Sequence, residues 1–329
     1  MRIAVDAFGG DNAPAAVVEG CIDALKKYPD MSVTLCGDEE RIKAELEKYR
    51  YDVARVDILH APEIISCDEQ PTFAIRKKKD SSLVKAMELV RDKKADCVVS
   101  AGSTGAVLAG ATFIIKRMAI GVVFPAEKGC VLIMDCGANV DCKPSYLQQF
   151  AVMASAYMHD IMGVDNPRVG LLNNGAEAEK GNELTKAAYK LLEQTPVNFA
   201  GNCEAREILS GDFDAIVCDG FAGNIVLKYT EGLAATLMGM LKKELMADTR
   251  SKLGVAMAKP AFRRFKKVMD YTEYGGAPLL GIDGGVIKAH GSSNAKAFAA
   301  ALGQARSFAS SGTNETIRRA VKSLPEVAD

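Results

Sequence analysis

The sequence predicts an α/β fold in which helices cover both faces of a mostly parallel β-sheet. Short apolar runs alternate along the chain with amphipathic stretches of helical periodicity, and strands that alternate with helices are typical of such a sheet. The chain has no internal repeat, low-complexity segment or long linker. We therefore expect residues 1–329 to form one α/β catalytic unit, in which any two lobes meet around a central cleft.

Apolar runs rich in Val, Ile and Leu predict the strands, because short runs of this kind are typical of buried strands. In chain order they are Arg2–Asp6, Ser32–Cys36, Val56–His60, Asp96–Ser100, Cys130–Asp135, Arg168–Asn173, Asn198–Ala200 and Asp214–Cys218.

The stretches between these runs predict helices. In the first of them Val17, Cys21 and Leu25 fall on one face, and Pro14 suits a first helical turn. By the same periodicity the helices are Pro14–Lys27, Glu39–Tyr49, Ser82–Lys93, Gly105–Lys116, Tyr146–Met162, Glu183–Glu193, Asn224–Leu245 and the tail from Asn294 onward. Between residues 231 and 271 two helical stretches meet near Leu253–Ala258 without a strand, which predicts a helical hairpin that projects from the body.

Composition excludes several classes of protein. Lys and Arg number 41 against 42 Asp and Glu, whereas a protein that binds mainly nucleic acid needs a positive excess. Nine cysteines without a Cys-x-x-Cys pair indicate neither a disulfide framework nor a zinc site. The chain opens on a strand-like segment without a signal sequence and has no uncharged run long enough to span a membrane. We expect a cytosolic protein.

Ligands of open parallel sheets bind beyond the carboxyl ends of the strands, and several predicted strands here end in Gly, Asp, Asn or Ser. None of these ends is a dinucleotide-binding or P-loop motif. The candidate cleft residues that they supply are Asp6, Gly9, Gly10, Asp11, Asp135, Asp141, Asn173 and Asp219. Such aspartates can act as general acids or bases or bind magnesium, but they also cap helices and stabilise turns.

The segment Gly102-Ser103-Thr104-Gly105 has the composition of a phosphate site. Glycine lets the backbone approach a ligand, the two hydroxyls can donate, and the helix that follows offers unpaired N–H groups to an anion. The alternative is an ordinary glycine turn in which Ser or Thr caps the helix.

His290 lies in a glycine-flanked loop between Lys288 and Ser292. Its basic and hydroxyl neighbours indicate phosphate contact or proton donation, although a lone histidine is more often structural. His60 and His159 have no such neighbours. Cys136 and Cys218 could be nucleophiles, but no local base accompanies them.

Taken together, these strand ends resemble the bacterial phosphate acyltransferase family, also called acyl-ACP:phosphate transacylases. The matching segments are Asp6-x-x-Gly9-Gly10-Asp11-x-x-Pro14, Ser100–Gly105, Asp135-x-Gly137-Ala138-Asn139-Val140-Asp141-x-Lys143-Pro144, Gly170–Asn173, Glu177-x-x-Lys180–Lys186, Asp219-Gly220-Phe221-x-Gly223-Asn224, Tyr274–Ala277 and Ile287–Ser293. They run nearly end to end in the family's order. Two departures are Phe8, where the family usually has Met, and a loop after Lys116 that is shortened or missing here.

The resemblance implies a fold like those of phosphotransacetylases and isocitrate/isopropylmalate-type decarboxylating dehydrogenases, a homodimer, and no metal or organic cofactor. It also implies the reaction: a long-chain acyl group passes from acyl carrier protein (ACP) to inorganic phosphate. The acyl-phosphate would then be used by a membrane-bound glycerol-3-phosphate acyltransferase in phospholipid synthesis.

For this reaction the protein must hold phosphate in line with the thioester and stabilise the oxyanion. We assign phosphate binding to Gly102, Ser103, Thr104, Gly105 and Ser292, aided by Lys288. Asn139 and Asn224 are the oxyanion candidates. His290 or Lys180 would support the leaving thiolate.

Two surface features of the predicted hairpin fit the partners that the resemblance implies. A basic cluster, Arg263, Arg264, Lys266 and Lys267, suits the acidic ACP, or is simply a solvated helix face. The predicted tip carries Leu253, Val255 and Met257 between lysines. Such a tip suits shallow insertion among anionic lipids, which predicts peripheral membrane association; dimer packing is the alternative.

Three other functions remain open at the level of sequence. An NAD-dependent decarboxylating dehydrogenase could use the same fold, with clustered arginines and a metal. A related transferase could use acetyl-CoA as its donor. A non-catalytic, membrane-docked scaffold would bind lipid without turnover.

Overall fold

The computed structural model describes the chain except for residues 67, 116–118, 270–276, 281–283 and 325–329. Its centre is an 11-stranded sheet of order β3-β2-β1-β4-β11-β10-β5-β6-β9-β7-β8. The strands are β1 Arg2–Asp6, β2 Ser32–Gly37, β3 Val56–His60, β4 Cys97–Ser100, β5 Ala119–Pro125, β6 Cys130–Met134, β7 Arg168–Asn173, β8 Asn198–Glu204, β9 Ala215–Val217, β10 Ala277–Leu280 and β11 Gly285–Lys288.

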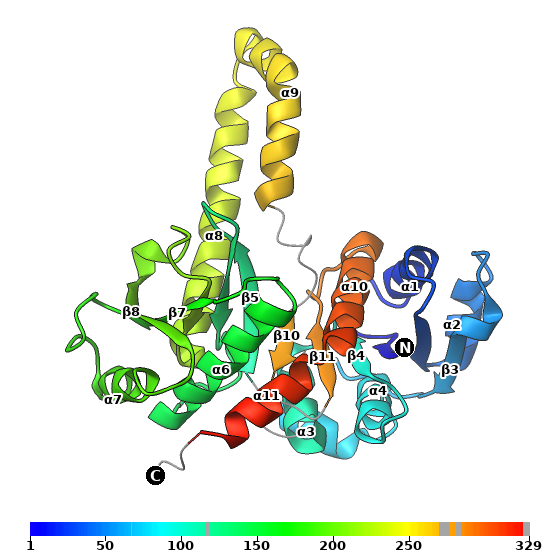
Figure 1. Cartoon of the computed structure of the whole chain (residues 1–329). Helices are drawn as coiled ribbons and strands as arrows, with labels where there is room; N and C mark the ends of the chain where they lie inside the picture. Colours follow the sequence, from blue (N-terminus) through cyan, green and yellow to red (C-terminus); the bar gives the residue numbers. More distant parts are fainter. Residues whose placement is uncertain (67, 116–118, 270–276, 281–283, 325–329) are drawn as a thin grey trace.

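Helices pack on both faces of this sheet (Figure 1). They are α1 Ala15–Lys27, α2 Glu39–Leu46, α3 Pro71–Lys77, α4 Ser82–Arg91, α5 Thr104–Gly110, α6 Pro144–Asp160, α7 Glu183–Leu192, α8 Gly220–Leu245, α9 Thr249–Met269, α10 Ala295–Ser311 and α11 Thr313–Lys322, with 3-10 turns at Val53–Arg55 and Ala205–Glu207. One buried cluster joins α1, α2 and α10 to strands β1–β4 and β11. Others place α4 and α5, and α6, α7 and α11, against the sheet.

The predicted α/β fold is confirmed. Two blocks of the sheet are parallel. One contains β3, β2, β1, β4 and β11, and the other contains β6, β9, β7 and β8. Between these two blocks, β10 and β5 run antiparallel to their neighbours. The observed bounds of β1, β3 and β7 are those that the apolar runs predict.

Strands β5, β10 and β11 are absent from the prediction. Both β10 and β11 are only four residues long, and their partners β4 and β5 precede the projecting hairpin. Short strands of this kind are stabilised by pairing with residues distant in sequence, which a local pattern does not reveal. The predicted helix after Ser103 also ends early: α5 stops at Gly110, a π-helical segment follows at Ala111–Ile115, and the predicted end, Lys116, lies outside the described residues.

Helices α8 and α9 form a hairpin that projects from the α/β body (Figure 1, yellow). Helix α8 begins at Gly220, four residues before the predicted start, because the Oδ1 of its N-cap Asp219 accepts the Ala222 N–H at 2.8 Å. The predicted turn near Leu253–Ala258 is wrong, since the two helices are separated at residues 246–248 and this segment lies inside α9. Asp248 caps α9 by accepting the Ser251 N–H at 2.8 Å.

The first turn of α8 packs tightly enough to predict the effect of two glycine substitutions. A Cβ on Gly223 would collide with the backbone carbonyl oxygen of Asp135, whereas a Cβ on Gly232 in the same helix would meet nothing. We expect Gly223→Ala to lower the free energy of unfolding by about 1–3 kcal/mol or more. Gly232→Ala should raise it by about 0.5–1 kcal/mol, because alanine is the better helix former. Urea unfolding of both variants measures the difference, and equal shifts would contradict the packing described.

Candidate active site

A cavity of about 400 Å³ lies where the carboxyl ends of β4 and β11 face the first turns of α8. Five residues assigned from the sequence line it: Thr104, Gly105, Asn224, Lys288 and His290. The remaining wall is largely apolar and includes Leu108, Ile120, Val122, Val123, Leu227 and Ala277. The cavity therefore joins a group of polar donors to a surface that can cover a hydrocarbon chain.

The pairing of β4 with β11 brings two of the predicted loops to one edge of the sheet. Ser100, the last residue of β4, is the register partner of Lys288, the last residue of β11. Lys288 is only 8% exposed, and its ammonium group donates a hydrogen bond to the Ala289 carbonyl oxygen. A buried cation at this position favours an anion in the cavity, because low dielectric strengthens the attraction.

Asp6 stabilises the loop that follows β4. Its carboxylate accepts hydrogen bonds of 2.6 Å from the hydroxyls of Ser82 and Ser100, and the Ser100 Oγ in turn accepts the Gly102 N–H at 3.0 Å. Burial raises the pKa of Asp6, while the two hydroxyls and the nearby Lys288 charge oppose that rise. The carboxylate therefore acts as a buried acceptor that fixes the loop.

The loop after β1 needs glycine at position 9. A Cβ there would lie 2.7 Å from the Gly102 nitrogen and would also collide with the Asp6 carboxylate. This loop also braces the one that carries His290, because the Asp11 N–H donates to the Gly291 carbonyl oxygen at 2.9 Å. Asn12, which the sequence did not single out, donates to the Ser292 and Ser293 carbonyl oxygens, each at 3.2 Å.

Ser103 and Thr104 have different roles in the structure. Ser103 Oγ accepts the Ala106 N–H at 3.5 Å and so caps α5, which was the alternative role considered for this segment. Thr104 is exposed and lines the cavity. Of the two hydroxyls, that of Thr104 is the one placed to meet a ligand.

His290 is exposed at the cavity and oriented by Ser292. Its Nδ1 accepts the Ser292 N–H at 3.3 Å and lies 2.8 Å from the Ser292 hydroxyl. When Nδ1 accepts, the neutral ring carries its proton on Nε2. Ser292, which the sequence assigns to phosphate binding, contacts the imidazole and orients it.

Asp135 stabilises the loop after β6, as Asp6 stabilises the loop after β4. It is fully buried and accepts N–H groups of Ile120 at 2.8 Å, Ala138 at 3.1 Å and Asn139 at 2.6 Å. Burial raises its pKa, and these hydrogen bonds oppose the rise. The side-chain amide of Asn139 also donates to Asp135, at 3.0 Å, and Asn139 does not line the cavity.

Four other predicted residues lie away from this cavity. Lys180 and Asp141 are exposed and do not line it. Asn173 donates to the Lys180 carbonyl oxygen at 3.1 Å and, with Asp219, lines a second cavity of about 540 Å³. The sequence placed Asn173 and Asp219 at strand ends but could not show that they line a cavity other than the one that contains Lys288.

The cavity also contains groups that the sequence did not assign. Lys228 and Glu231 form a 2.9 Å ion pair on α8, and both line it. Cys136 lines it too, and burial raises the pKa of its thiol, which opposes a role as nucleophile. Among the described residues, no three His, Cys, Asp or Glu side chains are grouped so that they could hold a metal ion.

On the hairpin, Arg263 and Arg264 are exposed, while the side chains of Lys266 and Lys267 lie outside the described ones. Leu253 is 63% and Met257 86% exposed, and Val255 is half-buried. Within the described part of the chain, no helix has the length and apolar character needed to cross a bilayer. Of the family motif Tyr274–Ala277 only Ala277 is described. The loop after Lys116, predicted to be shortened or missing, also lies outside the described residues.

Solved structures share this fold at low sequence identity. A phosphotransacetylase from Streptococcus pyogenes aligns with a TM-score of 0.59 and 18% identity, covering 94% of each chain. The EutD phosphotransacetylase from Staphylococcus aureus gives 0.58 and 17%, covering 96% of this chain and 94% of its own. A 4-hydroxythreonine-4-phosphate dehydrogenase from Klebsiella pneumoniae gives 0.56 and 12%, covering 94% and 98%.

Sequence relatives are much closer. A protein of Clostridium botulinum (strain ATCC 19397 / Type A) named phosphate acyltransferase is 56% identical over 312 residues, 93% of each chain. One of Clostridium perfringens (strain SM101 / Type A) with the same name is 53% identical over 315 residues, covering 94% of this chain and 93% of its own. A family model described as fatty acid synthesis protein matches residues 1–316. These matches confirm the resemblance: the chain belongs to the fatty acid synthesis protein family, with the phosphate acyltransferases.

Proposed function

We propose that this enzyme transfers an acyl group from a thioester to inorganic phosphate. The observation that supports it most directly is the cavity at β4, β11 and α8, in which Thr104, Lys288 and His290 adjoin an apolar wall. An acyl-phosphate contains both an anion and a hydrocarbon chain, so it needs both kinds of surface. The name that the 56% identical relative carries supports the same reaction.

Phosphate needs little activation, because it is already an oxygen nucleophile near neutral pH. We propose that Thr104 and Lys288 bind it beside the thioester carbonyl, so that a phosphate oxygen attacks the carbonyl carbon and the C–S bond then breaks. The Asn224 amide, which faces the same cavity, would stabilise the oxyanion. Asn139 is less suited to that role, because its amide donates to Asp135.

The leaving thiolate needs a proton or a hydrogen bond. In its imidazolium form His290 can give its Nε2 proton to sulfur, while Nδ1–H donates to the Ser292 hydroxyl 2.8 Å away. Lys180, the alternative donor, does not line the cavity. His290 is therefore the donor that we favour.

The finer proposal is that the donor is long-chain acyl-ACP, in the cytoplasm, and that a membrane-bound glycerol-3-phosphate acyltransferase uses the product. The apolar wall supports a hydrocarbon donor, and the family description supports a role in fatty acid metabolism. Exposed Arg263 and Arg264 on α9 would attract the acidic carrier. Residues 1–329 would then act as one catalytic unit, since both blocks of the sheet contribute to the cavity wall.

Peripheral membrane contact through the hairpin is part of the proposal. Leu253 and Met257 are exposed near the start of α9, at the end of the hairpin far from the body. Exposed apolar side chains among lysines favour shallow insertion in an anionic bilayer.

Flotation with anionic liposomes tests this contact. The fraction of Leu253→Glu/Met257→Glu that floats should fall well below that of the wild type, and unchanged flotation would rule out insertion at these residues.

We also propose a homodimer that uses α8. Exposed apolar side chains recur along one stripe of this helix, namely Phe221, Ile225, Tyr229, Leu233 and Leu237. A stripe of this length is typical of a helix that packs against another surface. Light scattering should give twice the chain mass for the wild type and the single mass for Ile225→Glu/Tyr229→Glu.

The reaction itself is tested by incubating purified protein with palmitoyl-ACP and radiolabelled phosphate. We expect labelled acyl-phosphate and free ACP, with much less product from acetyl-CoA. No product with intact carrier and phosphate would contradict the proposal. Binding of NAD or lipid binding without turnover would then favour the dehydrogenase or the scaffold.

Thr104→Val tests the phosphate site. The substitution keeps the shape and removes a hydroxyl that would donate to an anion, a hydrogen bond worth about 1.5–3 kcal/mol. We expect the KM for phosphate to rise about tenfold or more, with the KM for the acyl donor little changed. Thr112→Val is the matched control, because the Thr112 hydroxyl donates to the Leu108 carbonyl oxygen and is not part of the cavity lining. Equal effects in both variants would remove Thr104 from the site.

His290→Gln tests the proton donor. With an alkyl thioester we expect kcat to fall by about 10²–10⁴, the range typical of a lost general acid. With a thiophenyl ester the fall should be much smaller, because an aryl thiolate leaves without a proton. The two rates are measured by single-turnover kinetics after thermal melting shows that the variant is folded. The same loss with both esters would mean that His290 acts in another way.

A further inference from the structure

Within the part of the chain that the structure describes, three basic side chains on α3 and the turn after it have no acidic partner. Arg76, Lys77 and Lys79 are exposed, and none forms an ion pair within the described residues. Their neighbour Lys78 differs, since it pairs with Glu69 at 2.8 Å. The nearby Asp80 carboxylate binds Lys85 at 2.9 Å instead. The three charges are therefore available to another molecule.

Two exposed aromatic rings accompany these charges. Phe73 is 60% and Phe113 is 48% exposed. The Lys77 ammonium lies 5.3 Å from the centroid of the Phe73 ring, and the Arg76 guanidinium 4.6 Å from that of Phe113. Stacking of this kind restrains the two long side chains, and aromatic residues with arginine are the types enriched at the centres of protein interfaces. We call Phe73, Arg76, Lys77, Lys79 and Phe113 the α3 surface.

The α3 surface adjoins the cavity. Helix α3 follows β3, so it lies at the carboxyl edge of the same parallel block as β4 and β11. It packs against α5, and a Cβ on Gly105, a cavity residue, would lie 2.6 Å from Cγ of Pro71 at the start of α3. A protein docked on α3 would therefore stand beside the wall that receives the acyl group.

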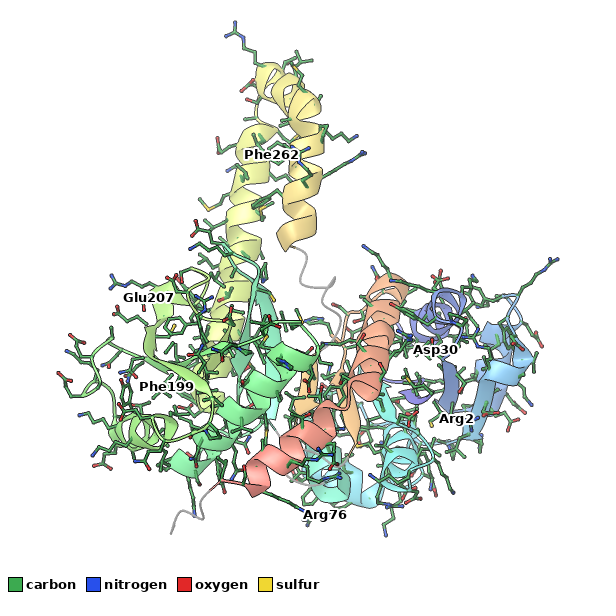
Figure 2. The ribbon with its side chains drawn as sticks, viewed as in Figure 1. Arg2, Asp30, Arg76, Phe199, Glu207 and Phe262 are labelled. Atoms are coloured by element: carbon green, nitrogen blue, oxygen red, sulfur yellow. The ribbon has the colours of Figure 1, made fainter. Side chains whose placement is uncertain are left out.

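We propose that the α3 surface docks the acidic carrier protein that delivers the acyl thioester; this rests on the proposed function. The whole chain has a net charge of only -1, so the positive charge of the α3 surface is a local feature. Its sign is opposite to that of the acidic carrier protein. In Figure 2, Arg76 lies at the edge of the α/β body far from Phe262 on the hairpin, beside the arginines of α9. Attraction by α9 and docking on α3 are thus separate events that separate variants can test.

The test compares donors with and without the carrier. Lys77→Glu/Lys79→Glu should raise the KM for palmitoyl-ACP at least tenfold and weaken its dependence on salt, since like charges then face each other. The KM for palmitoyl-pantetheine, which has no carrier, and the KM for phosphate should stay within twofold of wild type. Lys186→Glu/Lys190→Glu on α7, two exposed lysines, makes the same charge change elsewhere and should leave all three constants unaltered. If the glutamate variant does not fold, Lys77→Ala/Lys79→Ala replaces it.

Several results would overturn the proposal. One is an unchanged KM for palmitoyl-ACP while Arg263→Glu/Arg264→Glu raises it, which would place docking on α9. Another is an equal rise with palmitoyl-pantetheine, which would mean damage to the cavity. A third is loss of liposome flotation with an unchanged KM, which would make the α3 surface a lipid contact. Absence of acyl-phosphate from either donor in the wild type would instead refute the proposed function.

Discussion

The buried Asp6 carboxylate is the group on which the geometry of the site depends. Burying a carboxylate is costly unless hydrogen bonds and an opposite charge offset the loss of water. Here the hydroxyls of Ser82 and Ser100 and the charge of Lys288 supply that compensation. The two hydrogen bonds tie α4 and the end of β4 to the first strand, and β11 pairs with β4. The fold can therefore hold Lys288 almost without solvent and direct its charge toward the cavity.

Asp135 repeats this arrangement in the other block of the sheet. It holds the loop after β6 through N–H groups of Ala138 and Asn139, and the Asn139 carbonyl oxygen accepts the Gly220 N–H at 2.7 Å. That bond fixes the start of α8 and so the position of Asn224. Both aspartates act as structural acceptors, and the proposed mechanism assigns the chemistry to Thr104, Lys288, Asn224 and His290. Transfer to phosphate suits such a site, because the nucleophile needs no strong base.

The sequence predicted those elements and site residues that local patterns determine. Isolated apolar runs predicted the observed bounds of β1, β3 and β7, and the strand-end motifs identified five of the residues that line the cavity. Prediction from the sequence failed where pairing with a distant strand, or one particular hydrogen bond, determines the position of an element. Strands β10 and β11 exist because they pair with β5 and β4. The hairpin turn was misplaced because the Asp248 cap, which starts α9 at Thr249, depends on a particular hydrogen bond to the Ser251 N–H. Asn139 and Lys180 stand in suitable motifs, but only the fold shows that neither lines the cavity with Lys288.

Helix α8 connects the site to the end of the hairpin. It starts beside Asp135, contributes Asn224 and Leu227 to the cavity within its first turns, and continues to Leu245. At about 1.5 Å per residue its 26 residues span about 39 Å as one rigid element. The first turn cannot shift without moving Gly223 against the Asp135 backbone. A surface that bound the far end of the hairpin would therefore also orient Asn224, because α8 runs without a break from the cavity to the turn at residues 246–248.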